Sequence, residues 1–135
     1  MINSLLALLL PHKHLVRTLA LAWMVVIFLL SAQTSLHIPS MFFQQDKAFH
    51  SLLFSVLGIF YSLLVMRYVS RFTFWHVVIV TLMVMAYGGL DEFHQSFVPG
   101  RTPDILDLAA DTTGGLISAL LMKYILNRYA HRKLT

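Results

Sequence analysis

Four apolar segments, each long enough to cross about 30 Å of hydrocarbon as a helix, dominate this sequence. They run over residues 15–32, 48–66, 72–90 and 105–126. Lipid offers no partners to open backbone groups, so such segments must satisfy their hydrogen bonds internally, as helices. The sequence therefore predicts an all-α membrane protein, a four-transmembrane-helix bundle, with residues 1–135 forming one transmembrane domain.

The composition agrees with a chain that lies in lipid. Hydrophobic residues make up 58% of the sequence and charged residues 12%, against about 25% charged residues in an average soluble domain. There is no cysteine, which excludes a disulfide framework, a thiolate zinc site and a catalytic thiol. The first segment could also be a signal peptide that ends at Ser31-Ala32, but the missing A-x-A pattern favours an uncleaved span.

The basic residues predict the orientation of the bundle. Cytoplasmic loops retain lysine and arginine, and most of the basic residues flank one side of a four-span arrangement. They are Lys13, Arg17, Arg67, Arg71, Lys123, Arg128, Arg132 and Lys133. Both termini are therefore expected in the cytoplasm. These residues are of the kind that contact anionic membrane lipids, and nothing in their arrangement indicates nucleic-acid binding.

All acidic residues gather on the opposite, outer side. A carboxylate at membrane depth costs roughly 2.5–3.5 kcal/mol, so each of these residues needs a partner, a ligand or a reaction. They are Asp46, Asp91, Glu92, Asp104, Asp107 and Asp111. Only two fixed cations, Lys47 and Arg101, share that side, which leaves the outer half of the chain with a negative net charge.

The first acidic group begins the second segment. Asp46, Lys47, His50 and Phe54 can share one helical face because their spacings are three and four residues. One interpretation is an interfacial cap, in which Asp46 complements the helix dipole and Lys47 extends toward water. His50 has no such explanation inside an apolar run, which makes it a candidate base, ligand or carboxylate partner.

The second group follows the third segment. If that helix continues through Gln95, both Asp91 and Glu92 lie beside the Gln95 amide. Adjacent carboxylates repel each other unless a cation intervenes, and the planar guanidinium of Arg101 can pair with a carboxylate or a phosphate. The Pro-Gly pair before Arg101 predicts a turn that brings this arginine back toward the helix end.

The third group lies on the fourth segment. Asp104, Asp107, Asp111, Gly114 and Ser118 occupy a stripe about 80° wide on a helix. A helix face with three acidic residues is not expected to be exposed to lipid, so we expect it to be buried in protein or to line a polar cavity. Gly114 and Ser118 indicate close helix packing. For the acids, one interpretation is an interhelical salt-bridge network with the outer cations and a protonated histidine.

Together these residues resemble the VanZ-like family, small bacterial membrane proteins named for a protein linked to resistance to the glycopeptide teicoplanin. The resemblance implies a four-span fold, a multi-pass location in the bacterial cytoplasmic (inner) membrane, and an effect on cell-envelope antibiotics; it implies no reaction. Asp111 departs from the asparagine expected there and adds a negative charge deep in the span. The resemblance rests on Ser31, Asp46-Lys47-x-x-His50-x-x-x-Phe54, Asp91-Glu92-x-x-Gln95-x-Phe97-Val98-Pro99-Gly100-Arg101, Asp104-x-x-Asp107 and Gly114-Gly115.

Two functions stay open. In the first, an outward-facing acidic and arginine pocket binds a polar or lipid-linked cell-envelope component, or a glycopeptide antibiotic, without chemistry. Lys47 and Arg101 would hold an anionic group, and the carboxylates would hold cationic or hydroxyl groups. The candidate ligand-binding residues are Lys47, His50, Asp91, Glu92, Gln95, Arg101, Asp104, Asp107 and Asp111.

In the second, the pocket is a membrane-embedded, divalent-metal-dependent hydrolase or transferase site for an envelope lipid or glycan precursor. Mg²⁺ or Ca²⁺ would suit it, because both ions prefer oxygen ligands. His50 or Asp46 would act as a general base and Arg101 would stabilise developing charge. The sequence does not decide whether the chain is an enzyme, and a carrier would require an oligomer. The candidate metal ligands are Asp91, Glu92, Asp107 and Asp111.

Overall fold

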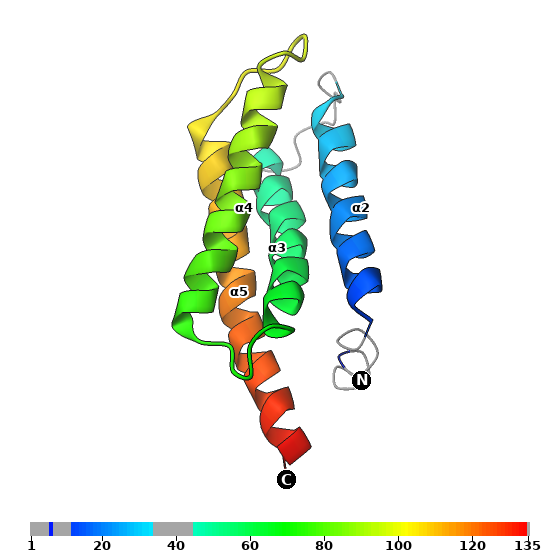
Figure 1. The fold of residues 1–135 in the computed structure, drawn as a ribbon. Helices are drawn as coiled ribbons and strands as arrows, with labels where there is room; N and C mark the ends of the chain where they lie inside the picture. The colour runs from blue at the N-terminus through cyan, green and yellow to red at the C-terminus, as the bar shows by residue number, and fades with distance from the viewer. Residues whose placement is uncertain (1–5, 7–11, 34–44, 135) are drawn as a thin grey trace.

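A computed structural model of the chain describes residue 6 and residues 12–33 and 45–134. Within these ranges all regular secondary structure is helical, with α2 (Lys13–Ser31), α3 (Gln45–Met66), α4 (Phe74–Gln95) and α5 (Ile105–Leu134). The helices run alternately in opposite directions, so that α2 begins and α5 ends at the same end of the bundle (Figure 1). Helix α5 extends beyond the other helices at that end (Figure 1).

The four helices are long and apolar enough to span a membrane, as the sequence predicts. Their candidate spans are His14–Ser31, Asp46–Met66, Phe74–Gln95 and Ile105–His131. Large apolar side chains on the outer faces of the helices are exposed, among them Leu21, Leu52, Leu90 and Ile105. Apolar outer faces are typical of helices that contact lipid.

The helices begin and end within three residues of the predicted bounds, except where α4 and α5 end. Helix α4 begins after Thr73, where the Thr73 N–H donates to His76 Nδ1 at 2.8 Å in a capping box. At its other end α4 continues past Leu90 to Gln95, because the polar side chains of this last turn have partners inside the bundle. Helix α5 continues past Leu126 to Leu134.

Small residues bring α3 and α5 close together, as the stripe on the fourth segment predicts. Gly114 lies directly against the Ser51 carbonyl oxygen, and the Ser55 hydroxyl donates to the Gly114 carbonyl at 3.1 Å. One turn further along, Gly58 of α3 lies against Ser118 of α5. The prediction of close packing through small residues is confirmed, and this contact places the polar start of α3 beside the acidic start of α5.

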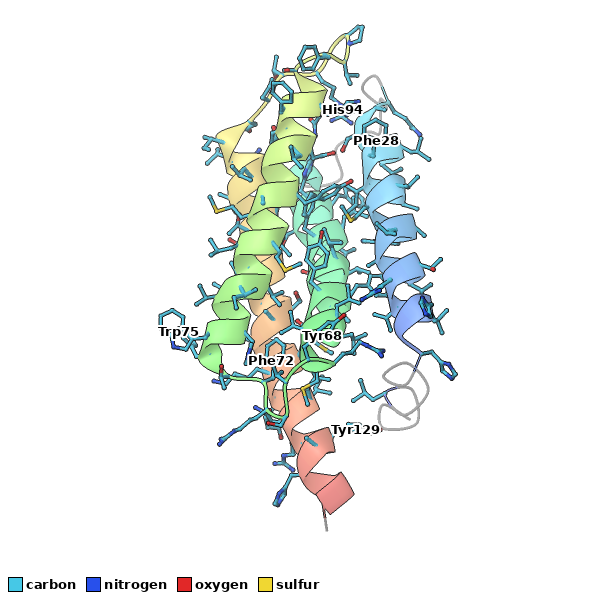
Figure 2. All side chains as sticks on the ribbon, in the orientation of Figure 1. Phe28, Tyr68, Phe72, Trp75, His94 and Tyr129 are labelled. Carbon is cyan, nitrogen blue, oxygen red and sulfur yellow. The ribbon has the colours of Figure 1, made fainter. Side chains whose placement is uncertain are left out.

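Helix α2 is attached to the other helices through hydrogen bonds to backbone carbonyls. Trp23 Nε1 donates to the Leu53 carbonyl of α3 at 2.9 Å, and the Tyr87 hydroxyl of α4 donates to the Met24 carbonyl at 2.6 Å. The ring centroids of Phe28 and His94 lie 4.1 Å apart at the end of the bundle where α2 ends (Figure 2). The two hydrogen bonds attach the middle of α2 to α3 and α4, and the ring contact holds the last turn of α2 beside the last turn of α4.

Candidate functional site

The predicted outer residues lie at the end of the bundle where the chain passes from α4 to α5 (Figure 1). They come from the first turns of α3, the last turns of α4 and the segment that begins α5. Hydrogen bonds and ion pairs join most of them into three separate groups, which together we call the carboxylate cluster. Its members are Lys47, His50, Asp91, Glu92, Gln95, Asp104, Asp107 and Asp111, with Ser31 at the end of α2.

Lys47 is the cation of the cluster. Its ammonium donates to Asp104 Oδ2 at 2.8 Å and to Asp107 Oδ1 at 2.9 Å, and it lies 3.6 Å from the exposed Asp46. The hydrogen bond from Lys47, followed by one from the Leu106 N–H, lowers the pKa of Asp104. Lys47 on α3 therefore neutralises part of the negative charge at the start of α5. Because its ammonium is already bonded to carboxylates, it has little capacity left for an anionic ligand.

His50 lies one turn deeper in the bundle and pairs with Asp111. The distance between His50 Nδ1 and Asp111 Oδ1 is 3.1 Å, and Asp111 is fully buried. The imidazole also stacks on Phe54, with the ring centroids 6.4 Å apart. On α4, Gly88 makes room for the pair, since a Cβ on Gly88 would lie 3.0 Å from Asp111 Oδ2.

Asp91 joins α2 to α4. Its Oδ2 accepts a hydrogen bond from the Ser31 hydroxyl at 2.6 Å and another from Gln95 Nε2 at 3.0 Å. The predicted neighbourhood of Asp91 and Gln95 is confirmed. Ser31, in contrast, is not among the predicted site residues, although it interrupts the apolar run at the end of the first span and belongs to the motif that carries the family resemblance.

Glu92 reaches the loop before α5. Its Oε2 accepts the backbone N–H of Asp104 at 2.7 Å, while the side chain stays buried. This bond fixes the direction of the Glu92 carboxylate and ties the end of α4 to the start of α5.

Three carboxylate oxygens in the cluster have no hydrogen-bond partner among the described residues. Asp91 Oδ1, Glu92 Oε1 and Asp111 Oδ2 are all buried. A buried polar atom without a partner costs roughly 1–3 kcal/mol, and more when the group is charged. The salt-bridge network predicted as one interpretation is therefore present only in part, because it leaves one oxygen of each of these three acids unsatisfied.

Arg101 and Asp46 lie at the edge of the cluster. The predicted turn before Arg101 is present, with Gly100 at a φ of 81° and the Arg101 N–H bonded to the Val98 carbonyl at 3.1 Å. The guanidinium, however, donates through Nε to the Gln33 carbonyl at 3.2 Å. Within the part of the chain that the structure describes, no carboxylate forms an ion pair with Arg101.

Among the described residues, one group of side chains is close enough together that it could hold a metal ion. Single ligand atoms of His50, Glu92 and Asp107 lie within 4.8 Å of one another. Of the predicted metal ligands, Glu92 and Asp107 belong to this group, whereas Asp91 and Asp111 bond to other side chains. The donor set contains a nitrogen, in contrast to the oxygen-only set that the sequence suggests.

Comparison with known proteins gives one family. The family model described as VanZ/LLP1 matches residues 14–127, which is most of the chain and includes every member of the carboxylate cluster. No curated protein and no solved structure gives a significant match.

Proposed function

The chain belongs to the VanZ/LLP1 family, and from that premise we propose that its carboxylate cluster binds a polar component of the bacterial cell envelope. The component is lipid-linked or is a glycopeptide antibiotic, and its binding alters antibiotic susceptibility. The cluster faces outward from the cytoplasmic membrane.

The distribution of basic residues supports this orientation. Arg67 and Arg71 lie between α3 and α4, and Lys123 and Arg128 lie toward the far end of α5. All four are at the end of the bundle opposite to the carboxylate cluster, and lysine and arginine are retained on the cytoplasmic side of membrane proteins. An outward-facing cluster can meet envelope components that never enter the cytoplasm.

The observation that carries the proposal is the set of three buried, unpartnered carboxylate oxygens of Asp91, Glu92 and Asp111. Because they are acceptors only, they match a ligand that offers donors, such as an ammonium group or sugar hydroxyls. Lys47 is already engaged by carboxylates, so Arg101 at the edge is the residue that would receive an anionic group such as a phosphate. A ligand with an amine or hydroxyls and a nearby anionic group fits this arrangement.

The test uses teicoplanin and the lipid-linked disaccharide-pentapeptide precursor of the cell wall as probes. Glu92→Gln keeps the shape of the side chain and an acceptor for the Asp104 N–H, but it removes the charge. We expect it to weaken binding of at least one probe to the protein in nanodiscs by roughly tenfold or more, since a charge-assisted hydrogen bond contributes about 1.5–3 kcal/mol. Expression of the wild type, but not of this variant, should then change teicoplanin susceptibility.

Asp46→Asn is the matched control. Asp46 is also acidic and contacts Lys47, but its side chain is 63% exposed, so its neutralisation should leave binding unchanged. Binding of both probes that is equal in wild type, Glu92→Gln and Asp46→Asn would contradict the proposal.

A second candidate function is favoured by one observation, the grouping of His50, Glu92 and Asp107. A divalent metal held there would allow hydrolase or transferase chemistry on an envelope lipid or glycan precursor. Of the predicted catalytic residues, His50 belongs to this group, whereas Arg101 bonds to Gln33 and Asp46 is exposed at the edge. Turnover of the lipid-linked precursor by purified protein, abolished by a chelator, would distinguish this function from binding alone.

A further inference from the structure

We propose that His50, Glu92 and Asp107 bind one divalent transition-metal ion of the class of Zn²⁺ or Mn²⁺. The residues come from three helices, α3, α4 and α5, and one ligand atom of each lies within 4.8 Å of the others. Nitrogen and oxygen ligands bind Zn²⁺ at about 2.0–2.2 Å, so side-chain rotations must bring the three atoms closer together for all of them to reach one ion.

His50 is oriented in the way that metal-binding histidines are. Its Nδ1 lies 3.1 Å from Asp111 Oδ1, and Asp111 is fully buried. A carboxylate that accepts the Nδ1 proton fixes the tautomer in which Nε2 is free to bind a metal, and it raises the basicity of the ring. Asp111 is therefore a positioning residue in this proposal and not a ligand.

The two carboxylate ligands are also oriented through one oxygen each. Glu92 Oε2 accepts the Asp104 N–H at 2.7 Å, and Asp107 Oδ1 accepts the Lys47 ammonium at 2.9 Å. The second oxygen of each carboxylate is thereby left for a metal ion. Partners of this kind, which hold the ligands from outside, are a regular part of protein metal sites.

A buried atom without a partner distinguishes this group from an ordinary acidic cluster. Glu92 is 7% exposed, and its Oε1 has no hydrogen-bond partner among the described residues. A carboxylate oxygen in that state is stabilised by a cation and destabilised without one. The same ion would offset part of the negative charge that Lys47 leaves uncompensated.

The donor set selects the class of metal. Mg²⁺ and Ca²⁺ prefer oxygen ligands alone, whereas an imidazole together with carboxylates suits zinc, manganese and iron. The absence of cysteine also means that any tight binding of Zn²⁺ must come from nitrogen and oxygen donors. This inference goes beyond the proposed binding function and does not depend on it, because the metal is measured without any other ligand.

The test measures metal bound to the full chain, purified without a histidine tag and first treated with a chelator. We expect equilibrium dialysis to give one Zn²⁺ per wild-type chain, with Mg²⁺ and Ca²⁺ unable to compete at similar concentrations. Glu92→Gln should weaken Zn²⁺ binding by about 100-fold, and Asp46→Asn should leave it unchanged. An absence of stoichiometric Zn²⁺ and Mn²⁺ binding in the wild type would overturn the proposal, whatever the variants do.

A spectroscopic measurement identifies the nitrogen ligand. Electron spin-echo modulation of bound Mn²⁺ should show coupling to an imidazole nitrogen in the wild type and lose it in His50→Gln. Persistence of that coupling in His50→Gln would assign the ion to another histidine and reject the site. Equal Zn²⁺ affinity of wild type and Glu92→Gln would reject it as well, even if teicoplanin or the cell-wall precursor still binds.

Discussion

Gly114→Ala should cause the largest loss of stability of any single methyl group added to this protein. The new Cβ would overlap the Ser51 carbonyl oxygen and lie 2.9 Å from Ser55 Oγ. Because the first of these neighbours is backbone, no rotamer change relieves the contact, and α3 must move away from α5. We expect a destabilisation of about 3 kcal/mol, at the upper end of the usual cost of overpacking, measured by thermal unfolding in detergent.

Gly89→Ala is the matched control, since a Cβ at Gly89 has no neighbour within 4 Å. Glycine costs a helix roughly 1 kcal/mol relative to alanine, so this variant should melt at the wild-type temperature or slightly above it. Equal melting temperatures for Gly114→Ala and Gly89→Ala would show that α3 and α5 do not pack as closely as described.

Lys47→Met should give the second large effect, because one ammonium serves three carboxylates. Without it, Asp104 and Asp107 lose their cation and repel each other at the start of α5. We expect the melting temperature at neutral pH to fall by roughly 5 °C or more. Methionine preserves most of the side-chain volume, so the fall in melting temperature measures the loss of the charge and not a loss of packing.

The pH dependence of this variant provides its internal control. In the wild type the Lys47 ammonium lowers the pKa of Asp104, so the stability that this pair contributes is present at neutral pH and is lost as the pH falls through that lowered pKa. In Lys47→Met, protonation of the unpaired Asp104 relieves its repulsion with Asp107, and acidification should narrow the gap in melting temperature between the variant and the wild type. A gap that is independent of pH would mean that Lys47 acts through packing alone.

The sequence predicts the fold well because the signals for it are local. Length and hydropathy identify each span, and the spacing of Gly114 and Ser118 predicts the face of α5 that packs against α3. The errors concern helix ends. The end of α4 at Gln95 depends on contacts with α2 and α5, which no single segment reveals.

The candidate site is predictable in its residues but not in its pairings. Helical spacing places Lys47 and His50 on one face of α3. It also places Asp107 and Asp111, with Asp104 just before the helix, along the face of α5 that packs against α3. Which carboxylate each of them meets depends on how far α3 is shifted along α5, and this shift is set by the packing of glycines. The partner of Arg101 is the backbone carbonyl of Gln33, just after α2. Every residue has such a carbonyl, so the sequence of side chains cannot indicate which one Arg101 meets.

Glu92→Gln offers the most direct test of whether the carboxylate cluster is built for a ligand or for holding the helices together. The measurement is thermal unfolding in detergent after chelator treatment, with no probe present. A ligand site that leaves Glu92 Oε1 buried without a partner among the described residues should gain stability when the charge is removed. We therefore predict a melting temperature equal to or above that of the wild type. A melting temperature clearly below those of the wild type and Asp46→Asn would contradict it and identify Glu92 as a structural residue.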